Sequence, residues 1–188
     1  MRTLQRVLLV EDHEPLLAAL RRGLSLRPVE LLLARSVAEA QVGLLSNPDA
    51  VVTDVRLPDG TALDVTRLAL QMRPVPLLVA ISGEASPEEA FELAGHGVRK
   101  YLAKPLSADQ LWDALVDARD SAPPLEPLAA ACVGHSDIRQ VEGKVRQAML
   151  DQALALAGGN LTEAARILRV SRQAVQRQAR GRPGGVEE

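Results

Sequence analysis

Four of the five short apolar runs in the first two thirds of this 188-residue chain end at a side chain that can bind a cation or take part in a reaction. Glu11 and Asp12 follow the first run, Asp54 the third, Ser82 the fourth and Lys104 the fifth. In an open parallel sheet, ligands bind just beyond the carboxyl ends of the strands. We therefore expect these five side chains to meet in one pocket.

The chemistry of such a pocket follows from its charges. Three carboxylates repel one another unless a hard cation lies between them, and oxygen ligands with open positions for water suit Mg²⁺. The Asp54 carboxylate can then attack a phosphoryl group in line with its leaving group and form an acyl phosphate. Lys104 would contact one phosphoryl oxygen, and the Ser82 hydroxyl would move to donate a hydrogen bond to another.

Each of these side chains also has a plainer interpretation when it is taken singly. Glu11 and Asp12 would be solvated loop acids, Lys104 an exposed surface lysine and Tyr101 a half-buried strand aromatic. Only their joint placement favours a site. Imidazole is a poor ligand for Mg²⁺, so we interpret the histidines as structural: His13, His96 and His135.

The apolar runs alternate with segments of helical periodicity. The runs cover residues 7–10, 31–33, 50–53, 77–81 and 101–103. The helical segments cover residues 14–28, 36–46, 61–73, 86–96 and 107–119. Runs this apolar suit strands that are buried on both faces. The alternation predicts an α/β fold, a doubly wound five-stranded parallel sheet with helices on both faces.

Composition places the domain boundary after this sheet. Three prolines within residues 123–127 predict a stiff linker, so we expect an α/β domain over 1–120, a Pro/Ala-rich linker over 121–136 and a small all-α domain over 137–188. The first domain carries 13 basic and 17 acidic side chains, whereas the last carries 9 and 6, within a net charge of -2. The local excess of arginine suits a polyanionic partner.

The compartment is predicted from cysteine usage and hydropathy. The single cysteine, Cys132, excludes an internal disulfide and fits a reducing cytosol. The run at residues 7–10 is too short for a signal peptide, and no stretch approaches the length of a membrane span. We expect a cytoplasmic protein without a membrane partner.

The C-terminal segment predicts two short helices joined by a tight turn. The first ends at Leu168, residues 169–171 form a turn capped by Ser171, and the second runs over 172–180, which is helix-turn-helix geometry. Val175 and Ala179 would face inward. The second helix presents outward Arg172, Gln173, Gln176, Arg177 and Arg180. Such side chains can hydrogen-bond guanine and adenine edges and neutralise phosphates, which predicts binding to double-stranded DNA.

A longer helix precedes this unit, and Gly158-Gly159 is expected to end it. A largely apolar stripe at helical spacing consists of Ile138, Val141, Val145, Ala148, Met149 and Gln152, and it continues to Leu156. The stripe is compatible with the seam of a homodimer, but a monomeric helix that packs on its own domain would show the same pattern.

Four strings in the first domain resemble the receiver domain of two-component response regulators, over about Arg6 to Arg119. They are VLLVED (7–12), VVTDVRLPDG (51–60), AISG (80–83) and YLAKPL (101–106). The resemblance implies phosphorylation of Asp54 by a sensor histidine kinase and no enzymatic activity beyond self-catalysed phosphorylation and dephosphorylation. It implies Mg²⁺ ligands at Glu11, Asp12, Asp54 and the backbone carbonyl of Arg56. It also implies a cis Lys104-Pro105 peptide and a switch pair, Ser82 and Tyr101.

The string GGNLTEAARILRVSRQAVQRQ resembles the Fis-type helix-turn-helix of NtrC-like regulators. A receiver followed directly by this module resembles the short RegA, PrrA and ActR type, in which the preceding helix, here Ile138 to Leu156, pairs two subunits. Arg169 departs from the usual turn glycine, and Ala174 and Ala179 replace a common threonine and leucine. A non-glycine residue in a left-handed turn costs about 1 kcal/mol.

Two other functions are compatible with parts of this pattern. A phospho-switched adaptor would bind protein through the C-terminal helices. A Mg²⁺-dependent aspartyl-phosphate phosphatase would place its nucleophile in a D-x-D signature after the first strand, where this chain has Glu11-Asp12. No ATP-binding loop of the G-x-x-x-x-G-K-[ST] form occurs, so the chain would act by occupying DNA. Arg56 and Glu84 are expected at the rim of the pocket, either paired or separately solvated.

Overall fold

The computed structural model describes residues 4–84, 87–123 and 126–180. The chain divides into two compact units, Met1–Pro123 and Pro124–Glu188, and each is described by itself. Within the described ranges, no helix combines the length and the apolar character that crossing a membrane requires.

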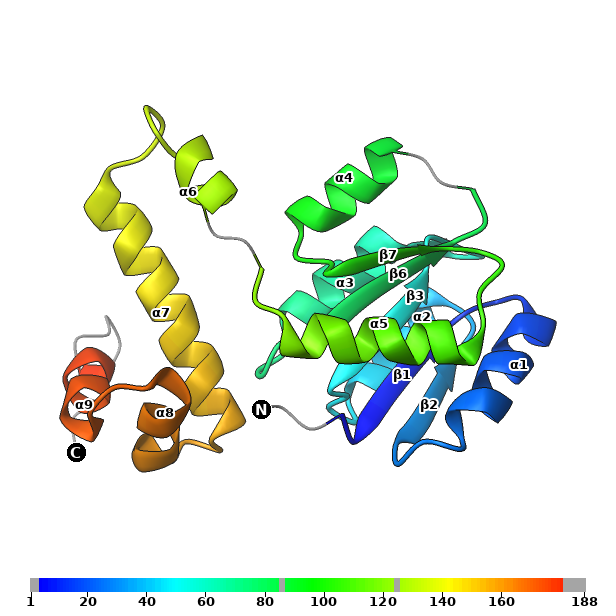
Figure 1. Cartoon of the computed structure of the whole chain (residues 1–188), viewed down its shortest axis with the longest axis horizontal. Coiled ribbons are helices and arrows are strands. Elements are labelled where there is room, and N and C mark those ends of the chain that lie inside the picture. Colours follow the sequence, from blue (N-terminus) through cyan, green and yellow to red (C-terminus); the bar gives the residue numbers. More distant parts are fainter. Residues whose placement is uncertain (1–3, 85–86, 124–125, 181–188) are drawn as a thin grey trace. The chain divides into compact units, whose positions relative to one another are not determined.

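A parallel sheet of five strands forms the centre of the first unit in the described part of the chain (Figure 1). The strands are β1 (Arg6–Val10), β2 (Glu30–Ala34), β3 (Ala50–Asp54), β6 (Leu77–Ser82) and β7 (Lys100–Ala103). Their order is β2-β1-β3-β6-β7, so strand order reverses between β1 and β3. Every residue of β3 is buried, as expected for a central strand. The predicted doubly wound fold is confirmed.

Helices cover both faces of this sheet (Figure 1). They are α1 (Glu14–Leu24), α2 (Val37–Leu44), α3 (Ala62–Leu70), α4 (Pro87–Gly95) and α5 (Ala108–Asp120). Leu17 of α1 and Leu111 of α5 pack with Leu9 of β1 on one face, whereas α2, α3 and α4 pack with Leu8 on the other. Successive strand residues point to opposite faces, so each strand contributes to both cores.

Two predicted helices are shorter in the structure. The helix expected over 14–28 ends at Leu24, and the one expected over 61–73 ends at Leu70. Pro28 is the last residue of the first expected segment and Pro74 follows the second, and the residue before a proline is disfavoured in the helical region. The chain therefore leaves each helix some residues before the proline.

α1 and α5 lie side by side, and a polar cluster joins their ends. The guanidinium of Arg27 lies 5.7 Å from the centroid of the Trp112 ring, and its Nη2 lies 2.7 Å from Oδ1 of Asp109. A cation over an indole face is attracted by the ring quadrupole. This cluster ties the turn after α1 to the first half of α5.

The second unit is helical. It contains α6 (Glu126–Ala131), α7 (Ile138–Leu156), α8 (Leu161–Leu168) and α9 (Arg172–Arg180). A small core joins the last three helices: Leu150, Ala153, Ala164, Ala165 and Val175. α6 lies inside the segment 121–136 that is expected to be a linker. A helix can form there because proline is tolerated in the first helical turn, and Pro127 is the second residue of α6. Gly158 and Gly159 have positive φ and follow the end of α7, as predicted.

Candidate phosphoacceptor site and helix-turn-helix

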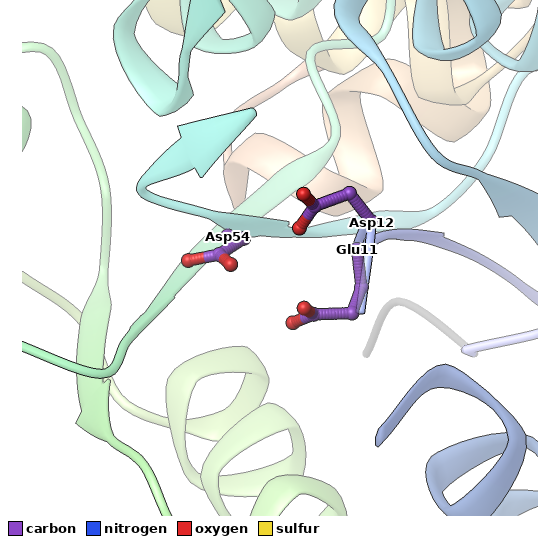
Figure 2. Close-up of side chains that lie close together, drawn as sticks. All are labelled: Glu11, Asp12 and Asp54. Atoms are coloured by element: carbon purple, nitrogen blue, oxygen red, sulfur yellow. The ribbon is translucent and has the colours of Figure 1, made fainter. Parts of the chain in front are cut away.

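Three carboxyl groups converge at the carboxyl ends of β1 and β3 (Figure 2). Glu11 and Asp12 follow β1, Asp54 ends β3, and each contributes an oxygen that lies within 4.8 Å of the others. Two ligands on opposite sides of Mg²⁺ are separated by about 4.2 Å, so a small inward movement of these side chains would be enough to bind one such ion. Glu11 is buried and Asp12 is exposed, which leaves one side open to water and substrate.

Lys104 supplies a cation to the same site from the end of β7. Its Nζ lies 2.6 Å from Oδ2 of Asp54 and 2.7 Å from Oε2 of Glu11. Burial raises the pKa of Glu11, and the negative charge of Asp54 acts in the same direction. Burial alone would lower the pKa of Lys104, but its hydrogen bonds to Asp54 and Glu11 raise it above the ordinary value. Lys104 therefore remains a cation beside Asp54.

Asp54 opens into a cavity of about 270 Å³. The cavity is lined by Asp54, Arg56, Ser82, Gly83, Glu84 and Lys104. The buried hydroxyl of Ser82 donates to the backbone carbonyl of Glu84, at 2.6 Å, rather than toward Asp54. A phosphoryl group on Asp54 would occupy this cavity between Ser82 and Lys104.

Other residues singled out in the sequence lie in or near this site. Tyr101 is half-buried on β7, and its buried hydroxyl has no hydrogen-bond partner among the described residues. The Lys104-Pro105 peptide is cis, as the resemblance implied. Nη2 of Arg56 lies 3.4 Å from Oε2 of Glu84, so these two side chains are paired rather than separate. His13 precedes α1 as its N-cap residue, and its side chain makes no capping hydrogen bond.

One residue near the site has a role that the sequence did not indicate. Arg56–Leu57 (β4) and Gly60–Thr61 (β5) form a small antiparallel hairpin after Asp54, and Asp59 at its tip accepts hydrogen bonds from the start of α2. The Pro-Asp-Gly string at residues 58–60 is a turn signal, which could have indicated the hairpin but not its contact.

α8, the turn and α9 have the predicted helix-turn-helix form. Arg169 in the turn is left-handed, with φ 55° and ψ 41°, which is the conformation expected where a glycine is usual. The hydroxyl of Ser171 accepts from the amide of Ala174, at 3.2 Å, and so caps α9. Val175 is buried, and Ala179 is half-buried, as expected for the inward face.

The outward face of α9 is polar and accessible. Arg172, Gln173 and Arg177 are exposed, and Gln176 is half-buried. The fifth predicted contact, Arg180, ends α9, but its side chain lies outside the described side chains. A helix of this kind can enter the major groove of DNA.

The expected apolar stripe of α7 is largely uncovered in the described part of the second unit. Leu150 and Ala153 pack on those helices, whereas Ile138, Val145 and Met149 are exposed by 72%, 44% and 55%. The stripe borders a groove of about 690 Å³ in the second unit that Leu168 and Val170 also line. The helix-turn-helix therefore buries Leu150 and Ala153 but leaves these three stripe residues exposed.

Comparisons with known proteins agree with both halves of this description. Residues 7–116 match the family "Response regulator receiver domain", and residues 139–178 match "Bacterial regulatory protein, Fis family". The chain is 31% identical to the photosynthetic apparatus regulatory protein RegA of Cereibacter sphaeroides over 174 residues, which cover 91% of this chain and 88% of that protein. It is 28% identical to the acid tolerance regulatory protein ActR of Rhizobium meliloti, over 91% of this chain and 84% of that protein.

A solved structure supports the fold of the first unit. The non-phosphorylated HemR receiver domain from Leptospira biflexa aligns with a TM-score of 0.57 and 26% identity, over 64% of this chain and 98% of that domain. With the acid pocket, the flanking lysine and the C-terminal helix pair in place, the chain belongs to the two-component response regulators, as a receiver domain followed by a Fis-family helix-turn-helix DNA-binding domain.

Proposed function

We propose that Asp54 accepts a phosphoryl group from the phosphohistidine of a sensor kinase and that the phosphorylated chain regulates transcription as a DNA-bound homodimer. The observation that carries this proposal is the contact of Lys104 with both Asp54 and Glu11 in a pocket that also holds Asp12. In this proposal the receiver comprises residues 1–120, a linker residues 121–136 and the DNA-binding domain residues 137–188.

In the transfer, a carboxylate oxygen of Asp54 forms a bond to phosphorus while the bond from phosphorus to the histidine nitrogen breaks, and the imidazole leaves. Lys104 holds one phosphoryl oxygen. Glu11, Asp12, Asp54 and the carbonyl of Arg56 would hold Mg²⁺, which offsets negative charge at the phosphoryl group. The product is an acyl phosphate, so the chain is a phosphoacceptor rather than an enzyme for another substrate.

The signal then spreads from the phosphoryl group. Its negative charge attracts the Ser82 hydroxyl away from the Glu84 carbonyl, and Tyr101 changes rotamer with it. The surface formed by α4, β7 and α5 is altered as a result. The phosphoryl group can shift the equilibrium between the inactive and active conformations only if it interacts more favourably with one of them. The new hydrogen bond from Ser82, which forms only in the active conformation, supplies that difference.

DNA binding is assigned to α9 and pairing of subunits to α7. Arg172, Gln173, Gln176, Arg177 and Arg180 would contact base edges and phosphates. The exposed stripe of α7 would form the dimer seam, because pairing two such helices would remove this apolar surface from water. A dimer would place two copies of α9 on two half-sites.

The test is aspartate-dependent phosphorylation linked to DNA selection. The full-length protein and Asp54→Asn are incubated with Mg²⁺ and a small acyl phosphate, and intact mass is measured. The wild type should gain the mass of one phosphoryl group and Asp54→Asn none. Both proteins are then used to select sites from a random DNA pool. An adduct that forms equally well in Asp54→Asn would refute the assignment.

A further inference from the structure

The segment that follows Asp54 is a hairpin fastened at its base. Arg56 of β4 lies opposite Thr61 of β5. The amide of Ala62 donates to the carbonyl of Val55, at 3.0 Å, and closes the two ends of the hairpin. These hydrogen bonds therefore constrain the backbone of residues 56–61 between Asp54 and α3.

The tip of the hairpin is fastened to a different element, α2. Oδ1 of Asp59 accepts from the amide of Val37 at 2.7 Å, and Oδ2 accepts from the amide of Ala38 at 2.9 Å. The next amide, of Glu39, donates to the hydroxyl of Ser36 at 3.1 Å. One carboxylate thus satisfies two of the free N–H groups at this helix start, and a local serine satisfies a third.

Close packing reinforces this contact. A Cβ atom on Gly60 would lie 2.9 Å from Cγ2 of Val37 and 2.9 Å from Oδ2 of Asp64, so a larger residue would force these side chains to shift. Asp64 in turn accepts from the amide of Thr61, at 2.9 Å, at the start of α3. The hairpin is held between two helix starts.

We propose that Asp59 is a positioning residue for the metal site. By holding the hairpin tip on α2, Asp59 fixes the backbone of Arg56. The Arg56 carbonyl is the one backbone ligand in the proposed Mg²⁺ set, so a side-chain substitution cannot remove it. This inference rests on the proposed function, because it requires that the pocket binds Mg²⁺. Substitution of a residue that orients a metal ligand typically lowers the affinity for the metal by about 10- to 100-fold.

A purely structural role for Asp59 predicts a different outcome. Asp59 would then only cap α2, and Ser36, whose hydroxyl caps the same helix by accepting from the amide of Glu39, would be equivalent to it. Ser36→Ala is therefore the matched control. It removes a cap from α2 and leaves the hairpin contact in place.

The experiment measures Mg²⁺ affinity by isothermal titration calorimetry on full-length wild type, Asp59→Ala, Asp59→Asn and Ser36→Ala, with thermal unfolding of each. We expect Asp59→Ala to weaken Mg²⁺ binding by about 10-fold and Ser36→Ala to change it by less than about 2-fold, while both lower the unfolding midpoint. Asp59→Asn should fall between wild type and Asp59→Ala, because its amide oxygen still accepts one hydrogen bond.

Two results overturn the inference alone: equal Mg²⁺ affinity of wild type and Asp59→Ala, or equal weakening by Asp59→Ala and Ser36→Ala. If Asp59→Ala does not fold, Asp59→Asn is judged by the same criterion. Absence of Mg²⁺ binding by the folded wild type overturns the proposed metal site and this inference together, so the two failures are distinguishable.

Discussion

Arg56 and Glu84 form an ion pair at the rim of the cavity that leads to Asp54, with Nη2 of Arg56 3.4 Å from Oε2 of Glu84. Both side chains are mostly exposed, and an exposed pair contributes about 0 to 1 kcal/mol to stability. Its importance lies in its position, since both residues line the cavity beside Asp54 and would hinder water that approaches the proposed acyl phosphate from that side.

Breaking this pair should shorten the life of the phosphorylated state. We expect Arg56→Ala and Glu84→Ala each to speed the loss of the phosphoryl group by up to about 5-fold, which corresponds to the removal of about 1 kcal/mol. The double variant should resemble either single one, because both remove the same pair. The measurement is the decay of the phosphorylated fraction by intact mass, and unchanged rates in both single variants would contradict the prediction.

Removal of Lys104 should expose the repulsion between Glu11 and Asp54. In Lys104→Ala two carboxylates face each other without their shared cation, so we expect the free energy of unfolding without Mg²⁺ to fall by about 1 to 3 kcal/mol. Lys100→Ala is the control, because Lys100 pairs with Asp117 at a more exposed position. Denaturant unfolding followed by circular dichroism measures both. A loss in Lys104→Ala no larger than in the control would show that Lys104 does not offset this repulsion.

A charge on the exposed stripe of α7 should separate the proposed dimer. Val145→Glu puts a carboxylate in the stripe, whereas Gln140→Glu adds the same charge at an exposed position on the other side of α7. We expect sedimentation equilibrium to show the first variant as a monomer at concentrations where wild type and the second are dimers. A monomeric wild type, or an equal effect of both substitutions, would count against α7 as the seam.

Substitutions on α9 should weaken binding to DNA and reduce its dependence on salt. Arg177→Ala removes an exposed arginine from the outward face of α9, and Arg139→Ala removes one from α7. Loss of a phosphate contact should lower the slope of log affinity against log salt by about 1, and loss of a base contact should cost about 1 to 3 kcal/mol at one base pair. Fluorescence anisotropy with a selected site at several salt concentrations measures both effects. Arg139→Ala should behave as wild type, and a DNA affinity independent of salt would favour an adaptor instead.

The contact between Asp59 and α2 should leave a trace in the pH dependence of stability. Hydrogen bonds from the amides of Ala38 and Val37 lower the pKa of Asp59 below its ordinary value of 3.8. A carboxyl group with a lowered pKa in the folded state contributes stability above its unfolded pKa and loses it as the pH falls through the folded value. The difference in unfolding midpoint between wild type and Asp59→Ala should therefore be full near neutral pH and shrink below 3.8. A difference that stays constant into acid would exclude these hydrogen bonds as its source.

Much of the first unit could be predicted because its determinants are local and periodic. Apolar runs that alternate with helical segments leave few arrangements other than a parallel sheet, and residues at the carboxyl ends of parallel strands must meet. Glu11, Asp54 and Lys104 are therefore found together although 93 residues separate the first and the last. The same reasoning could not find Asp59, whose partners lie 21 and 22 residues away on another helix. That contact depends on where the turn of the β4–β5 hairpin lies in space, and the pattern of apolar residues carries no information about that position.

The second unit shows a different limit. The turn at Arg169 and the cap at Ser171 were predictable from neighbouring residues, as were the ends of α7. The side of α7 that packs on α8 and α9 was not predictable, because the helix has two apolar faces and the sequence does not distinguish between them. The structure assigns Leu150 and Ala153 to the core and leaves Ile138 and Met149 exposed.

The cluster of Arg27, Asp109 and Trp112 has a practical consequence for optical measurements. The chain has one tryptophan, one tyrosine and one phenylalanine, and these are Trp112, Tyr101 and Phe91, all in the first unit. Intrinsic fluorescence therefore reports on the receiver alone, with an emission sensitive to the guanidinium held over the indole. Melting of α7, α8 and α9 gives no such signal, so fluorescence and far-ultraviolet circular dichroism recorded together would separate the unfolding of the two units without any label.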